Sequence, residues 1–158
     1  MISKIFLVQH GEAKPESEDP ERPLSDNGIR QTEHIAQHIH SIGLSVPVVY
    51  HSGKLRARQT AEILGQKAFE LIPKETDGLS PKDAPLLWKD RLDSFGNGNV
   101  MLVGHLPHLA RLASLLLTGS MDPPVIAFRN SGIVCLVRDE TGRWLLTWAI
   151  TPDTLAGR

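Results

Sequence analysis

Cysteine, long apolar runs and surplus charge are all scarce in this sequence. Its one cysteine is Cys135 among 158 residues, which excludes an internal disulfide framework and a multi-cysteine metal site. The apolar run nearest the N-terminus covers residues 5–8, shorter than the roughly 7 to 15 apolar residues of a signal peptide. No run approaches the roughly 18 apolar residues of a membrane helix. We therefore expect a cytoplasmic protein without a membrane partner.

The charges nearly cancel. Seventeen basic residues against eighteen acidic residues give a formal net charge of −1, whereas nucleic-acid binders usually carry a basic excess. No nucleic-acid partner is expected for that reason. The length suits one domain with its own hydrophobic core, and we expect that domain to span residues 1–158.

The apolar pattern alternates between short strands and helices. Three apolar runs typical of buried strands cover residues 5–8, 46–50 and 100–103. Helical spacing is found over residues 25–43, about 52–65 and about 107–118, and two β-rich runs at 133–138 and 144–150 indicate a hairpin. This alternation predicts an α/β protein, a three-layer α/β/α sandwich with a mostly parallel mixed sheet. The stretches 14–22 and 73–85 are expected to be long loops that border the site.

Polar clusters follow each of the three expected parallel strands, at residues 9–12, 51–60 and 104–108. Because ligands bind outside the carboxyl ends of strands in open α/β sheets, His10, Arg56 and His105 should meet at one edge of the sheet. The two later clusters also lead into helix N-termini, which favour anions. Two imidazoles and a guanidinium at helix starts predict a phosphate site, where one histidine attacks phosphorus and the cations stabilise its oxygens.

Four segments together resemble the histidine phosphatase superfamily, whose members have a phosphoglycerate mutase-like fold. They are Leu-Val-Gln-His-Gly-Glu-Ala at 7–13, Arg-Pro-Leu-Ser at 22–25, Arg-Ala-Arg-Gln-Thr-Ala at 56–61 and Val-Gly-His-Leu-Pro at 103–107. Each segment alone is a weak signal, but all four occur in the order that the family has. The short chain and the His-Leu-Pro turn resemble the SixA-type phosphohistidine phosphatases.

The resemblance implies a role for each matching residue. His10 would be the nucleophile that becomes phosphorylated, and Arg56 and His105 would hold the transferring phosphoryl group. The substrate site would be lined by Gln9, Gly11 and Arg22. Water would then hydrolyse the phosphohistidine intermediate. No metal or other cofactor is implied, because protein cations neutralise the charge. The expected substrate and partner is a protein that carries phosphohistidine, with phosphate or small phosphate compounds as further ligands. The alternative is a phosphatase for small phosphate esters.

Position 9 departs from the family pattern. Gln9 stands where the family has an arginine that contacts the phosphate, and an amide brings neither charge nor a forked guanidinium. Loss of such a donor costs on the order of 10² to 10³ in rate if nothing replaces it. The cations that could replace it are Arg22, Lys54, Arg58 and Arg111. Without a replacement, the chain would be a catalytically weakened phospho-binding module.

The acid that protonates a leaving group is the second open point. The stretch 75–83 offers Glu75, Asp77 and Asp83, without a decisive match to the family. Imidazole, with a reference pKa near 6.5, leaves phosphorus far more readily than an alkoxide does. A site without a strong acid therefore favours phosphohistidine over sugar phosphates.

Overall fold

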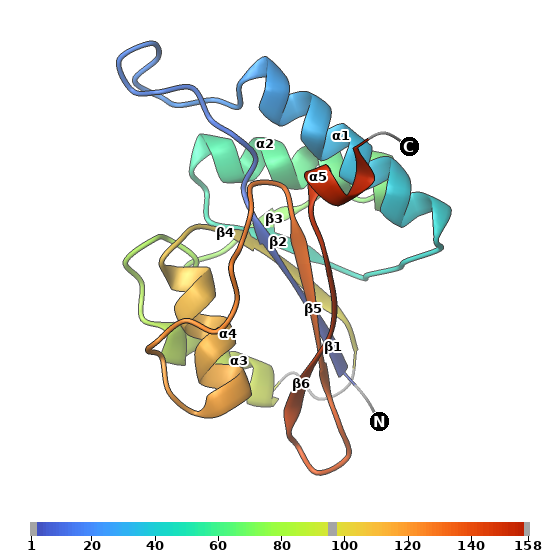
Figure 1. The fold of residues 1–158 in the computed structure, drawn as a ribbon, viewed down its shortest axis with the longest axis vertical. Coiled ribbons are helices and arrows are strands. Elements are labelled where there is room, and N and C mark those ends of the chain that lie inside the picture. Colours follow the sequence, from blue (N-terminus) through green and yellow to red (C-terminus); the bar gives the residue numbers. More distant parts are fainter. Residues whose placement is uncertain (1–2, 95–97, 157–158) are drawn as a thin grey trace.

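The computed structural model describes residues 3–94 and 98–156, and these contain one mixed six-stranded sheet (Figure 1). The strands follow one another across the sheet in the order β3-β2-β4-β1-β5-β6. Their bounds are β1 Ser3–Gln9, β2 Val49–His51, β3 Lys74–Glu75, β4 Val100–Gly104, β5 Ile133–Arg138 and β6 Trp144–Ile150. The first four in chain order pair in parallel, and β5 and β6 add an antiparallel hairpin. The mixed, mostly parallel sheet predicted from the sequence is confirmed.

Helices cover both faces of this sheet (Figure 1). On one face lie α1 (Asp26–Ser41), α2 (Leu55–Leu64) and α5 (Pro152–Leu155), and on the other lie α3 (Pro85–Ser94) and α4 (His108–Thr118). Side chains along β1 point alternately to the two faces of the sheet. Phe6 and Val8 pack toward the first group of helices, and Ile5 and Leu7 pack toward the second. The three-layer sandwich is confirmed. No helix within the described residues is long and apolar enough to span a bilayer.

The helix α1 begins where its sequence predicts. The Ser25 hydroxyl accepts a hydrogen bond from the Gly28 N–H at 3.0 Å, which satisfies one of the free donors at the helix start. A Cβ on Gly28 would lie 2.2 Å from the Glu12 carbonyl oxygen, so only glycine lets the chain after β1 pass this closely. At the other end, Ile42 follows the last helical residue and its side chain is exposed. The helical spacing of the sequence also predicts Ile42 on the buried face, and this expectation is wrong, because Ile35 packs there instead.

The α-helix α2 ends at Leu64, next to the predicted end at Gly65, but Gly65 does not terminate the helical chain. The chain continues from α2 into a π-helical turn, η1 (Gly65–Phe69), and stops at Glu70, whose φ of 54° is left-handed. A Cβ on Gly65 would lie 2.6 Å from the Leu71 carbonyl oxygen. Glycine is required here for close approach of the returning chain, so it does not act as a helix stop. The helix also begins at Leu55, three residues after Ser52.

Two further expectations need correction. Residues 46–48 precede β2, which begins at Val49, because Pro47 lacks the N–H that a paired strand needs. The stretch 73–85 is not a loop throughout, since β3 extends the sheet there by pairing with β2 and α3 begins at Pro85. The pairing of β3 with β2 covers only two residues, too few for an alternating apolar pattern in the sequence to predict the strand. Neither correction moves the strand ends that follow β1, β2 and β4.

A histidine is buried in the α4 layer. His108 is fully buried, and neither ring nitrogen has a hydrogen-bond partner among the described residues. Burial lowers the pKa of His108 to about 4, although the nearby Asp83 carboxylate opposes this and Arg111 adds to it. The neutral ring is thus the form that the fold accepts, because an unpaired buried charge is costly.

This burial predicts a pH-dependent stability. Below the ordinary value of 6.5 the unfolded chain takes up a proton at His108 while the folded chain does not, so stability present above pH 6.5 is lost as the pH falls toward 4. His108→Leu should reduce the fall in melting temperature between pH 8 and pH 5 by a few degrees, since about 1 kcal/mol corresponds to about 2–4 °C in a domain of this size. His40→Leu, on the exposed side of α1, is the matched control. Equal falls in wild type and His108→Leu would contradict the prediction.

Candidate active site

The carboxyl ends of three parallel strands converge at one edge of the sheet. His10, Ser52 and His105 directly follow β1, β2 and β4. The rings of His10 and His105 lie with their centroids 4.9 Å apart and tilted by 51°. The Ser52 hydroxyl lies 2.7 Å from Nε2 of His105, which joins the third strand end to the pair. The two histidines named from the sequence therefore share one site.

Hydrogen bonds fix the orientation of the His10 ring. Its Nδ1 lies 2.7 Å from the Gly11 carbonyl oxygen, which can only accept, so Nδ1 carries the proton and Nε2 keeps its lone pair. The main chain of His10 is held on both sides, by its N–H to the Gly104 carbonyl at 3.0 Å and by the Asn130 amide to its own carbonyl at 2.9 Å. A neutral ring held in this tautomer offers Nε2 as a nucleophile.

Burial keeps both rings neutral near pH 7. It lowers the pKa of His10 to about 4. The hydrogen bond to the Gly11 carbonyl opposes this shift, and the charges of Arg56 and Arg22 add to it. Burial likewise lowers the pKa of His105 to about 3, helped by His10, Arg56 and Lys54. The charged groups that act on the two rings are thus cations. Such surroundings oppose protonation of histidine and favour a bound anion.

The turn after β1 is tied to α2 through Gly11. The Gly11 N–H donates to the Thr60 hydroxyl at 2.8 Å, and that hydroxyl donates to the Arg56 carbonyl at 2.7 Å. A Cβ on Gly11 would lie 2.9 Å from the Thr32 hydroxyl and 3.0 Å from that of Ser131. Any larger residue would push apart the groups that hold the nucleophile's turn, which explains glycine at this position.

Three cations surround the histidine pair. Arg56 lies in the first turn of α2, and its Nε is buried with no hydrogen-bond partner among the residues that the structure describes. Burial and the neighbouring charge of Arg22 lower the pKa of Arg56. The guanidinium of Arg22 donates from Nε to the Lys14 carbonyl at 3.2 Å, and the residue itself has a left-handed φ of 52°. With Lys54 they form the positive side of the site, beside a pocket of about 440 Å³ lined by Glu21, Gly53, Lys54, Leu55, Arg56 and Arg58.

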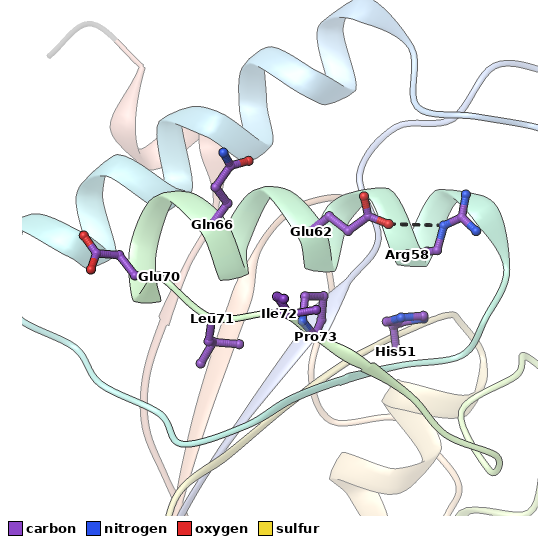
Figure 2. A pocket seen from close by; sticks show the side chains of 8 residues that line it. All are labelled: His51, Arg58, Glu62, Gln66, Glu70, Leu71, Ile72 and Pro73. Atoms are coloured by element: carbon purple, nitrogen blue, oxygen red, sulfur yellow. Dashed lines mark ion pairs between the residues drawn. The ribbon is translucent and has the colours of Figure 1, made fainter.

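The other two cations considered as replacements are each paired with a carboxylate. Arg58 pairs with Glu62 at 3.2 Å along the outer side of α2, and both line a separate pocket of about 570 Å³ with His51 (Figure 2). Arg111 pairs with Asp122 at 3.3 Å. Of the four candidates, Arg22 and Lys54 are the ones whose charges act on the histidine pair.

The three candidate acids also have other partners. Asp77 pairs with Arg91 at 2.6 Å, and that guanidinium holds the pKa of the Asp77 carboxyl below its usual range. Asp83 accepts from the Ser80 N–H at 2.9 Å. The Glu75 carboxylate packs on Gly53, where a Cβ would lie 2.7 Å from its Cδ. None of the three is held against His10 by a hydrogen bond. Within the described residues, no group of three His, Cys, Asp or Glu side chains could hold a metal ion.

Sequence reasoning missed several polar residues of the site. Ser52, Thr60 and Asn130 contact His105, Gly11 and His10 in turn. Ser52 and Thr60 lay inside a recognised cluster, but nothing in their spacing distinguished them from surface residues. Asn130 precedes β5, and only the antiparallel pairing of β5 with β1 brings it to this edge. The signal that could have located it is the Asn-Ser-Gly turn directly before the hairpin.

Comparisons with known proteins agree with this geometry. A model of the histidine phosphatase superfamily (branch 1) matches residues 5–80. The chain is 34% identical over 139 residues to an uncharacterised protein of Picosynechococcus sp., with 84% of each chain covered. It is 28% identical over 161 residues to phosphohistidine phosphatase SixA of Escherichia coli strain K12, with 96% of each covered.

A solved structure supports the same assignment. The protein histidine phosphatase SixA complexed with tungstate superposes with a TM-score of 0.79 at 27% identity, covering 96% of this chain and 99% of that one. The phosphoglycerate mutase-like sandwich expected from the sequence is thereby confirmed. The chain belongs to the histidine phosphatase superfamily and is a phosphatase of the SixA type.

Proposed function

We propose that this phosphatase removes phosphate from phosphohistidine in a protein, through a covalent phosphohistidine on its own His10 and without a metal or other cofactor. One observation carries the proposal. The Nδ1 proton of His10 is held by the Gly11 carbonyl at 2.7 Å, so the lone pair of Nε2 is free beside His105 and within the field of Arg22 and Arg56. A lone pair surrounded by cations is suited to attack a phosphoryl group.

The first step transfers the phosphoryl group to His10. Nε2 forms a bond to phosphorus while the bond from phosphorus to the substrate's ring nitrogen breaks, and that nitrogen keeps the electron pair. A phosphohistidine protonated on its other ring nitrogen departs as neutral imidazole and needs no acid from the enzyme. Arg56 and His105 donate to the phosphoryl oxygens in the transition state. The phosphoryl dianion favours the protonated form of His105 and so opposes the burial and nearby cations that keep the free ring neutral.

The distribution of charged groups favours phosphohistidine as substrate. Asp77 and Asp83 are held by other partners, and the Glu75 carboxylate packs on Gly53. An alkoxide leaving group would require such an acid close to the reacting atoms. Arg22 and Lys54 supply positive charge that position 9 lacks, which supports turnover over mere binding. The name of the Escherichia coli relative, a phosphohistidine phosphatase, and the oxyanion in the SixA–tungstate complex support the same substrate class.

Removal of the nucleophile tests the covalent step. His10→Ala should abolish turnover of a phosphohistidine peptide while the protein stays folded, because no other group holds a free lone pair in this position. Rapid quenching of wild type with ³²P-labelled substrate should place acid-labile, alkali-stable phosphate on His10. His34→Ala, on α1, is the matched control and should keep full activity. A His10→Ala enzyme that turns over at the wild-type rate would show that the mechanism is wrong.

Removal of the donors tests the phosphoryl clamp. Arg56→Ala and His105→Ala should each lower kcat/KM by about 10² to 10³, as expected for a donor to developing charge. Arg58→Ala is the matched control, because it removes a guanidinium of the same helix that pairs with Glu62. It should change kcat/KM by less than about threefold, since exposed ion pairs contribute little. EDTA should leave the rate unchanged. Loss of activity in EDTA with recovery in a divalent ion would overturn the metal-free proposal.

The rate of turnover of a phosphohistidine peptide, compared with that of an aryl phosphate, separates the remaining alternatives. The phosphohistidine peptide should be turned over with a higher kcat/KM than an aryl phosphate, because imidazole is the better leaving group. A preference for the ester would favour the small phosphate-ester phosphatase. Tight phosphopeptide binding without turnover would favour the phospho-binding module.

A further inference from the structure

Gln9 has a buried oxygen that the first reaction step does not use. The main chain of Gln9 is fixed at the end of β1, where it pairs with Gly104 and its carbonyl accepts from the Ser131 N–H at 2.9 Å. Alternation along β1 directs its side chain to the same face as Leu7, the face that α4 covers. There the side-chain Oε1 is buried and has no hydrogen-bond partner among the described residues. A buried acceptor left unpaired is costly, so a donor is expected to meet it in the working enzyme.

The phosphoryl group cannot be that donor. Its oxygens accept hydrogen bonds, as Oε1 does. A carboxamide has one donating end and one accepting end, so whichever way Gln9 turns, only its Nε2 can serve a phosphoryl oxygen. Arg56 and Arg22 are donors, but they are needed by the phosphoryl oxygens. If Oε1 accepted from either guanidinium, it would compete with those oxygens for the donor. The reactant that brings a spare O–H to this place is the water of the second step.

We propose that Gln9 orients the water that hydrolyses the phosphohistidine intermediate, with Oε1 accepting from the water and Nε2 donating to a phosphoryl oxygen. The inference rests on the proposed function, because it assumes a phosphorylated His10. It also gives a reason for the departure from the family's arginine, since a guanidinium has five donors and no acceptor. The amide cannot act as a base, so its contribution is alignment of the water with phosphorus.

The chemistry of the step balances without another reactant. The water oxygen bonds to phosphorus, the bond from phosphorus to Nε2 of His10 breaks, and its electron pair returns to Nε2. One proton of the water stays on the new hydroxyl, and the other moves to a phosphoryl oxygen, so that dihydrogen phosphate leaves. The proton on Nδ1 stays with the Gly11 carbonyl throughout, and its presence makes neutral imidazole the leaving group. Gln9 gains and loses no proton.

Rapid-quench kinetics can separate the two steps. Phosphoramidate serves as the phosphoryl donor, and the formation and decay of phosphate on His10 are followed in wild type, Gln9→Arg and Gln9→Met. Gln9→Arg restores a charged donor but removes the acceptor, whereas Gln9→Met has similar length and neither. The ratio of the hydrolysis rate to the phosphorylation rate should fall at least tenfold in both variants. The phosphoenzyme should therefore accumulate, most visibly in Gln9→Arg, where phosphorylation stays fast.

The outcomes separate this inference from the function on which it rests. Phosphate on His10 of wild type, together with an unchanged ratio of the two rates in either variant, would overturn the role of Gln9 alone. A slower phosphorylation with unchanged hydrolysis would do the same, and would assign Oε1 to a donor on the substrate. Turnover by wild type without any phosphate on His10 would overturn the proposed function and this inference with it. A purely structural role for Gln9 would slow both steps by one factor.

Discussion

The parallel pairing of β1 with β4 is the constraint on which the site depends. Their ladder ends with Gln9 opposite Gly104, and the His10 N–H then bonds to the Gly104 carbonyl. The equivalent positions after the two strands are therefore neighbours, and both are histidines. Ser52, after β2, reaches the same edge because β2 pairs with β4 on its other side. The sheet thus brings together groups that lie 42 to 95 residues apart in the sequence.

Burial gives these histidines their chemical character. It is the largest cause of the low pKa of His10, His105 and His108, and nearby cations lower the first two further. The folded protein therefore keeps neutral rings near pH 7, one of them with a lone pair aimed away from its own backbone. The same burial costs stability in acid, because the unfolded chain takes up protons that the folded chain refuses. Reactivity toward an anion and sensitivity to acid have one physical origin.

Sequence patterns predicted the parts of the structure that depend on local chemistry. Ser25 caps α1 as its position suggests, and the apolar runs around Leu7 and Leu102 form central strands. The features that the sequence patterns did not predict depend on contacts that each residue makes in the fold. Gly65 stays inside a helical turn because the returning chain packs against it, and Arg58 pairs with Glu62 one turn away. No spacing rule shows which of several arginines will face a phosphate and which will find a carboxylate.

The central claim is that His10 is neutral, protonated at Nδ1 and free at Nε2. Nitrogen-15 NMR of the histidine rings tests it directly, because the chemical shifts of the two ring nitrogens report both the tautomer and the charge. In the absence of phosphate, His10 should show the Nδ1–H tautomer from pH 8 to pH 5, because Nδ1 bonds to the Gly11 carbonyl. Because burial lowers its pKa, the ring should titrate only near pH 4. An Nε2–H tautomer, or titration near the ordinary value of about 6.5, would contradict the account.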